Sequence, residues 1–136
     1  MTSKETTKKI YLSGPMTGMP DYNYPAFHAV AERFRQAGWD VVSPAENFGG
    51  YVDLPRESFL RMDVSQIATC DAIAMLPGWR ESRGARMEYL IAHELGMEML
   101  DAQTLEPLAD APAAAVVLVL PERHARMMSL ITGAGQ

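Results

Sequence analysis

The chain has 136 residues and a formal net charge of −5, from 17 acidic and 12 basic side chains. This length suits one domain, and 48% hydrophobic with 21% charged residues is typical of a soluble globular protein. The negative charge argues against nucleic acid or an anionic membrane surface as a partner, so we expect the protein to bind a small molecule. The single cysteine, Cys70, precludes an internal disulfide.

Two features of the sequence bear on where in the cell the protein is expected. The first residues, MTSKETTKK, are polar and contain no apolar signal core, so we expect residues 1–9 to be a disordered tail before a domain at 10–136. The longest apolar run, residues 113–120, is far too short to span a bilayer. We therefore expect a cytoplasmic protein without a membrane partner.

The first half of the chain alternates between strand and helix patterns. Residues 10–13 predict a short strand, and the loop that follows, PMTGMPDYNYP, is rich in turn formers and aromatic residues. Pro25 then suits the start of a helix with one apolar face, and Gly38 suits its end. A second strand is expected at 39–42, followed by a loop and a second helix that runs to about residue 69.

The second half continues the alternation. A strand at 71–76 ends at Pro77 and Gly78, and a helix begins near Gly84 with an apolar stripe. Beyond Gly96 the pattern is weaker and predicts a strand at 97–100, a loop or small hairpin at 101–112, a fifth strand at 115–120 and a terminal helix.

Alternating strands and helices predict an α/β fold: a single Rossmann-like or flavodoxin-like domain with about five parallel strands and helices on both faces of the sheet. Such sheets bind ligands at the carboxyl ends of their strands. This rule places the loop after Ser13, the loop after Leu76 and the start of the helix near Gly84 at one edge, where we expect the site.

Glu88 lies at the edge of the apolar stripe near the start of that helix. Three arginines surround the same helix start: Arg80, Arg83 and Arg86. In an acidic chain, arginines beside a helix amino terminus suggest a bound anion, and phosphate is the obvious candidate. The alternatives are a Glu88 that only favours the helix dipole and a solvated arginine loop. If Ser82 caps the helix, the capping-box position falls on Ala85 and not on Glu88.

Three segments carry a family resemblance: KIYLSGPMTG, RMDVSQIATCDAIAML and SRGARMEYLIAHELG. In this order and spacing they resemble the nucleoside 2-deoxyribosyltransferase-like superfamily over roughly residues 9 to 100. That superfamily includes transferases that exchange bases on deoxynucleosides and hydrolases that cleave 2′-deoxynucleoside 5′-monophosphates. The chain also resembles a branch of it that is common in phage and prophage genomes. The resemblance implies an N-glycosidase that acts on a nucleoside or nucleotide.

The resemblance also implies roles for individual residues. Glu88 matches the glutamate that attacks C1′ of the sugar, Asp63 the carboxylate that assists proton transfer to the leaving base, and Tyr11 the tyrosine that steadies the nucleophile. Ser82 matches a serine that binds phosphate in the hydrolases. The full set expected to bind substrate is Ser13, Gly14, Pro15, Gly78, Ser82, Arg83, Gly84 and Ser129. Ser129 would reach a neighbouring subunit, so we expect at least a homodimer.

The chemistry is consistent with these residue types. Breaking an N-glycosidic bond passes through an oxocarbenium-like state, which calls for a carboxylate beneath C1′ and a proton source near the base. Glu88 and Asp63 can fill both roles, and we expect the arginines and the helix start to keep Glu88 ionised. The structural alternatives are a hydrogen-bonded Asp63 and a Tyr11 that is a core aromatic. Trp79, Tyr22 or Tyr24 could stack on a base or merely cover apolar surface.

Other chemistries have less support. The three histidines are scattered, and no HExxH, CxxC or GxGxxG spacing occurs, so we expect no metal and no cofactor. One alternative is a ribonucleoside-monophosphate phosphoribohydrolase of the lysine-decarboxylase-like type, whose PGGxGTxxE motif the LPGW and SRGARME segments faintly resemble. Another is a nucleotide-binding module without activity, because Pro15 and Thr17 stand where the monophosphate hydrolases carry a serine and an arginine.

Overall fold

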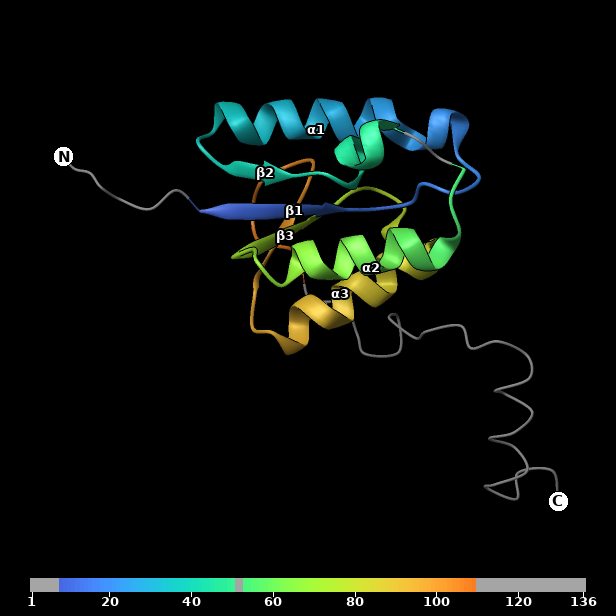
Figure 1. Ribbon diagram of the computed structural model, residues 1–136. Helices are drawn as coiled ribbons and strands as arrows, with labels where there is room; N and C mark the ends of the chain where they lie inside the picture. The colour runs from blue at the N-terminus through green and yellow to red at the C-terminus, as the bar shows by residue number, and fades with distance from the viewer. Residues whose placement is uncertain (1–7, 51–52, 110–136) are drawn as a thin grey trace, which may run out of the picture.

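The computed structural model describes residues 8–50 and 53–109. Strands and helices alternate along this part of the chain (Figure 1). In chain order they are β1 (Lys9–Ser13), α1 (Tyr24–Gln36), β2 (Asp40–Val42), α2 (Arg56–Ile67), β3 (Ala72–Met75), α3 (Arg83–Glu94) and β4 (Glu98–Asp101). A short 3₁₀ segment precedes each helix: Pro20–Asn23, Pro44–Gly50 and Trp79–Glu81. The described helices are all too short or too polar to cross a bilayer.

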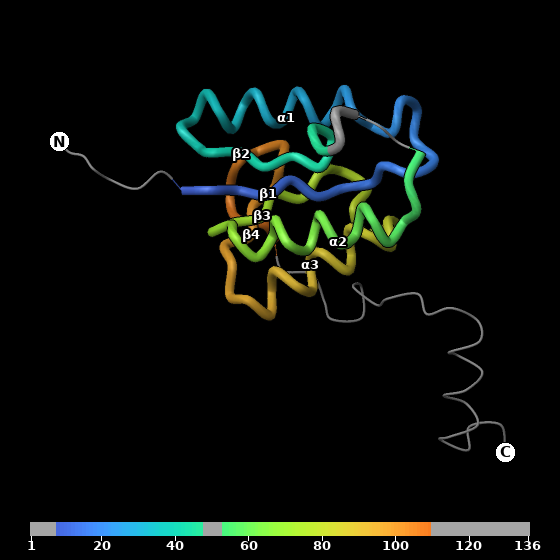
Figure 2. Tube along the Cα trace, in the orientation of Figure 1, coloured from blue at the N-terminus to red at the C-terminus, as the bar shows by residue number. Residues whose placement is uncertain are grey.

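The strands form one parallel sheet in the order β2-β1-β3-β4 (Figure 2). Helix α1 covers one face, and α2 and α3 cover the other (Figure 1). The predicted α/β fold, a single flavodoxin-like domain with helices on both faces of a parallel sheet, is therefore confirmed. The described residues form four strands where about five were expected. The fifth strand predicted at 115–120, the terminal helix and Ser129 all lie outside the described residues.

The boundaries of the elements differ from the prediction by a few residues. Strand β1 begins at Lys9, inside the range expected to be a tail, because the Lys9 N–H donates to the Asp71 carboxylate and the strand pairs with β2 from that residue. After β4, the chain turns back along the sheet edge. Leu100 forms an antiparallel bridge with Pro107, as expected of the loop or small hairpin predicted there.

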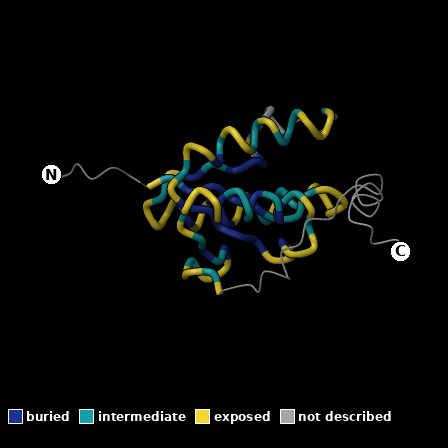
Figure 3. Tube along the Cα trace, turned by 90° about the horizontal axis from the view of Figure 1, so that it is seen from below, coloured by how far each residue is buried: buried dark blue, intermediate teal, exposed yellow. Residues whose placement is uncertain are grey.

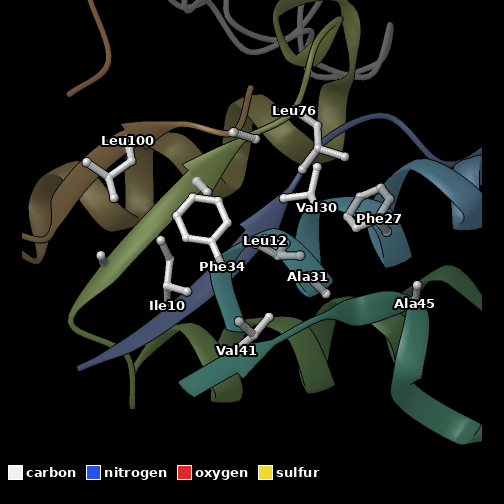
Figure 4. Packing of buried hydrophobic residues seen from close by; sticks show 13 residues of the cluster. Ile10, Leu12, Phe27, Val30, Ala31, Phe34, Val41, Ala45, Leu76 and Leu100 are labelled. Carbon is white, nitrogen blue, oxygen red and sulfur yellow. The ribbon is translucent and has the colours of Figure 1, made fainter. Parts of the chain in front are cut away.

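The core has two layers, one on each face of the sheet. The central strands β1 and β3 are almost completely buried, whereas the helices expose their outer faces (Figure 3). Aliphatic side chains of β1 and β3 pack against the apolar face of α1 (Figure 4). Because successive side chains of a strand point to opposite faces, β1 sends Ile10 and Leu12 into this layer and Tyr11 and Ser13 toward α3.

Candidate active site

Helix α3 places Glu88 against the central strand of the sheet. Ser82 caps the helix by accepting a hydrogen bond from the Ala85 N–H at 3.2 Å, so the helix begins at Arg83. Glu88, in the second turn, is buried, with 6% of its surface exposed. The Ser13 hydroxyl donates to Glu88 Oε1 at 2.6 Å, and the Tyr11 hydroxyl donates to Oε2 at 3.2 Å. Both oxygens of the carboxylate are therefore fixed by side chains of β1.

Asp63 joins this group from helix α2. The helix packs against α3, and Asp63 lies close enough to Glu88 and Tyr11 for its charge to raise the pKa of both groups. The three residues predicted to be catalytic, which lie far apart in the sequence, thus meet beside the carboxyl end of β1. Ser13, which was expected to bind substrate, is completely buried, and its hydroxyl contacts Glu88 instead.

Burial governs the protonation of the pair of carboxyl groups. Burial, and next the negative charge of Asp63, raise the pKa of Glu88 to about 8. Burial also raises the pKa of Asp63 to about 6, although its hydrogen bonds with Glu88 and Tyr11 lower it. The pKa of the Tyr11 hydroxyl is raised by burial and by Glu88. The arginines and the helix start were expected to keep Glu88 ionised, whereas its burial in the folded protein favours the neutral carboxyl.

The three arginines near the start of α3 do not form one cluster. Arg86 is buried, its Nη1 donates to the Arg80 carbonyl oxygen at 2.7 Å, and its Nε has no hydrogen-bond partner among the described residues. The Arg80 guanidinium lies 5.0 Å from the centre of the Trp79 ring. Of the three, Arg83 lines the large cavity above Glu88. The three guanidinium groups thus lie in three different environments.

A cavity of about 850 Å³ opens above the carboxyl pair. Its volume suits a nucleoside or nucleotide, since small-molecule pockets measure roughly 300–1,000 Å³. Most of the residues expected to bind substrate line it: Gly14, Pro15, Gly78, Ser82, Arg83 and Gly84. Apolar and aromatic side chains cover another part of the wall: Met16, Met19, Tyr22, Tyr24, Phe59 and Leu60.

The aromatic residues considered for base stacking fall into two groups. Tyr22 and Tyr24 line the cavity, and their ring centres lie 6.2 Å apart. Trp79 is buried elsewhere, with its ring stacked on Tyr89 at 4.7 Å. We therefore retain Tyr22 and Tyr24, and not Trp79, as candidates for contact with a base.

The loop that carries these tyrosines has an unusual backbone. Asp21, Tyr22 and Asn23 have φ angles of 51°, 54° and 62°, in the left-handed region that costs non-glycine residues roughly 1 kcal/mol each. The Asn23 side chain donates to the Pro15 carbonyl oxygen at 2.9 Å and ties the loop to the end of β1. Residues held in this conformation cluster at ligand sites, which is consistent with a loop shaped for binding.

Gly14 joins β1 to this loop where the sheet leaves no room for a side chain. A Cβ atom added to Gly14 would lie 2.7 Å from the Leu76 Cβ, whereas one added to Gly84 would meet nothing within 4 Å. We expect Gly14→Ala to lower the free energy of unfolding by about 1–3 kcal/mol, because the strand ends must separate. Gly84→Ala, the control inside α3, should be neutral or stabilising. Urea denaturation of both variants measures this, and equal stabilities would contradict the close packing.

The sequence analysis did not predict some residues of the cavity. Arg56 and Leu60 line it from α2, and Glu81 lines it from the segment before α3. The helical spacing of Arg56, Leu60 and Asp63 would have placed them on one face of α2, but only the position of Asp63 was singled out. Within residues 8–50 and 53–109, no three His, Cys, Asp or Glu side chains are grouped to hold a metal ion.

Together, the parallel sheet, the buried carboxyl pair at its carboxyl edge and the cavity above define an α/β protein with a candidate active site for a small molecule. Residues 8–101 match the family described as "Domain of unknown function (DUF4406)". The chain belongs to this family, which is nucleoside 2-deoxyribosyltransferase-like.

Two solved structures share the fold. The 2-desoxiribosyltransferase from Leishmania mexicana is 23% identical with a TM-score of 0.54, and the match covers 69% of this chain and 63% of that protein. A conserved protein from Enterococcus faecalis V583 is 20% identical with a TM-score of 0.56, and the match covers 92% of this chain and 75% of that protein. No curated protein sequence matches the chain.

Proposed function

We propose that the protein is an N-glycosidase that cleaves or transfers the base of a 2′-deoxynucleoside or its 5′-monophosphate. The observation that carries this proposal is the buried Glu88, held by Ser13 and Tyr11 and paired with Asp63 beneath a cavity of nucleotide size. A fixed carboxylate nucleophile beside a carboxyl proton donor is the arrangement that glycosidic cleavage with retention requires. The fold shared with a 2-desoxiribosyltransferase is consistent with this reaction.

In the proposed reaction, a Glu88 oxygen bonds to C1′ while the bond from C1′ to the base nitrogen breaks. The electron pair of that bond leaves with the base, which takes the proton from Asp63. Water or a second base then attacks C1′ and displaces Glu88, and Asp63 accepts the proton of the attacking group. Two inversions at C1′ give net retention, and the choice between water and base decides between hydrolysis and transfer.

A single proton shared by Glu88 and Asp63 is what both steps of the proposed reaction require. Two carboxyl groups this close titrate as a pair, so between about pH 6 and 8 the pair holds about one proton. The higher pKa of Glu88 favours the proton on Glu88 in the free protein, so the proton moves to Asp63 and the charge to Glu88 in the productive arrangement. Hydrogen bonds from Ser13 and Tyr11 favour the charged form of Glu88, and the positive charge that develops on the sugar favours it further.

The proposal includes a small-molecule substrate, no cofactor and a cytoplasmic location. We propose that the base lies against the apolar wall near Tyr22 and Tyr24 and that Ser82 contacts the 5′ side of the sugar. A homodimer, in which Ser129 completes a neighbouring site, also belongs to the proposal. Light scattering that shows a monomer at micromolar concentration would remove the dimer and the role of Ser129.

A panel of substrates tests the proposed function. The protein is incubated with the four 2′-deoxynucleoside 5′-monophosphates, the matching deoxynucleosides and the ribonucleotides, and free base is followed by chromatography. Release from the deoxy compounds alone supports the proposal. Release from AMP and other ribonucleotides would instead support the phosphoribohydrolase alternative, and tight binding of a nucleotide without release would support the binding module.

Replacing the proposed proton donor should change both rate and pH dependence. We expect Asp63→Asn to lower kcat/KM by about 10²-fold, because general-acid assistance to the base is lost. The charge and hydrogen bonding of Asp63 raise the pKa of Glu88, so the variant should also bring the ionisation of Glu88 below pH 8. The pH dependence of kcat/KM measures this shift.

A deoxyriboside whose leaving group needs no proton should lose much less activity in Asp63→Asn than a natural substrate does. Glu57→Gln, a change at an exposed carboxylate on the same helix, should behave as the wild type. Equal losses on both kinds of substrate would contradict a proton-donating role for Asp63.

A further inference from the structure

Arg56 lies on the wall of the cavity, and the glycosidase chemistry leaves it unused. It is the first residue of α2, and its side chain is exposed. Arg83, the first residue of α3, lines the same cavity. The two helices pack against each other and begin at the same end of the molecule (Figure 2). Two guanidinium groups from separate helices therefore border one opening.

Neither guanidinium has a partner in the described part of the chain. Arg35, by contrast, binds both oxygens of Glu46 at 2.9 and 3.0 Å, and Arg33 donates to backbone carbonyls of residues 102 and 103. Arg56 and Arg83 form no hydrogen bond and no ion pair with any residue in 8–50 or 53–109. Their donors are thus available to a ligand in the cavity, and a planar guanidinium matches phosphate oxygens well.

The distance between Arg56 and Asp63 along α2 determines which part of a substrate fits between them. Arg56, Leu60 and Asp63 have the spacing of one helix face, and all of them line the cavity. Seven residues of α-helix separate Arg56 from Asp63, which is about 10 Å along the axis. The arginine side chain, if it points into the cavity, covers part of this distance. The rest of the distance is suitable for a sugar that lies over the carboxyl pair and carries an anionic group on its 5′ carbon.

We propose that Arg56, together with Arg83, binds the 5′-phosphate of the substrate, and that Arg56 makes the site select nucleotides over nucleosides. This inference rests on the proposed function, which places the sugar over Glu88. Arg56 belongs to α2, whereas Ser82 and Arg83 lie at the start of α3, so the phosphate would be held by side chains from two helices. The site then has charge on two walls, and a neutral 5′-hydroxyl gains nothing from either arginine.

Binding measurements on a background without turnover test the role of Arg56. Calorimetry on Glu88→Gln protein gives Kd for each of the four deoxynucleoside monophosphates and the matching deoxynucleosides, with and without Arg56→Gln. We expect Arg56→Gln to raise Kd for the nucleotides about 10-fold, the effect of losing a hydrogen bond to a charged group, and to leave Kd for the nucleosides unchanged. Nucleotide binding should also weaken with added salt, and less steeply in the variant.

Two companion variants sharpen the comparison. Arg61→Gln removes an exposed arginine of the same helix that does not line the cavity, so it should match the unmodified background. Arg56→Lys keeps the charge without the planar fork and should give an intermediate loss. Inorganic phosphate, added as a competitor, should weaken nucleotide binding and leave nucleoside binding unchanged.

Several outcomes would overturn the inference. They are an unchanged Kd for nucleotides in Arg56→Gln, an equal rise for nucleotides and nucleosides, or no binding of any nucleotide. Failure of the proposed function looks different: nucleotides would bind in an Arg56-dependent way, yet the wild-type protein would release no base. Conversely, base release that ignores both the 5′-phosphate and Arg56 would leave the proposed function standing and remove the role of Arg56.

Discussion

Replacing Glu88 by glutamine or alanine is expected to lower base release from the preferred substrate by roughly 10³-fold or more, as removal of a catalytic nucleophile does. Glutamine keeps the shape of the side chain, and its amide oxygen can accept a hydrogen bond from one of the two hydroxyl groups, Ser13 or Tyr11, while its NH2 group can donate to the other. Its neutral amide cannot form the glycosyl ester. Chromatography of free base over a time course measures the loss.

The control for this experiment is Glu94→Gln, an exposed glutamate at the end of the same helix. It should retain the activity of the wild type. Mass spectrometry of the wild-type protein quenched during turnover should detect a sugar attached to Glu88. Full activity in Glu88→Gln would exclude the covalent route, and with it the central step of the proposed function.

The second large effect concerns stability and pH. The free energy of unfolding of the wild-type protein is expected to fall as the pH rises from about 5 to 9. The folded protein raises the pKa of Glu88 from 4.5 to about 8, so it prefers the protonated carboxyl. This contribution is fully present below pH 4.5, declines between 4.5 and 8, and is lost above 8. Its size is on the order of a few kcal/mol.

Asp63 adds a smaller loss at lower pH. Its pKa rises from 3.8 to about 6 in the folded protein, so its contribution disappears between those values. Glu88→Gln cannot ionise, and we expect it to remove most of the decline above pH 6. Urea denaturation at pH 5, 7 and 9 compares the two proteins. Parallel stability curves would show that Glu88 is not the group that destabilises the protein at alkaline pH.

Part of this site could be predicted from sequence because its signals are local. The spacing from Ser82 to Glu88 fixes the cap and the helix turn that carries the carboxylate, and the structure has both. The alternation of strands and helices predicts a parallel sheet, and a parallel sheet brings strand ends to one edge. That rule was enough to expect the loops after β1 and β3 to meet.

The features that were missed depend on packing between distant segments. Ser13 was expected to face the substrate, but close packing of α3 on β1 buries its hydroxyl against Glu88. The same burial reverses the expected charge preference of Glu88, and no local pattern reports the loss of hydration. Arg56 was overlooked because its neighbours in sequence carry no motif. Its place becomes apparent once the start of α2 is seen at the cavity.

The side chains of β1 have different roles on the two faces of the sheet. Ile10 and Leu12 fill the layer beneath α1, and Tyr11 and Ser13 hold Glu88 on the other face. Inserting or deleting a single residue in this strand would exchange the faces, placing hydroxyl groups among aliphatic side chains and aliphatic groups against the carboxylate. Substitutions can alter either face separately, whereas changes of length alter both. Evolution can therefore retune this strand by point mutation, but its length is expected to stay fixed.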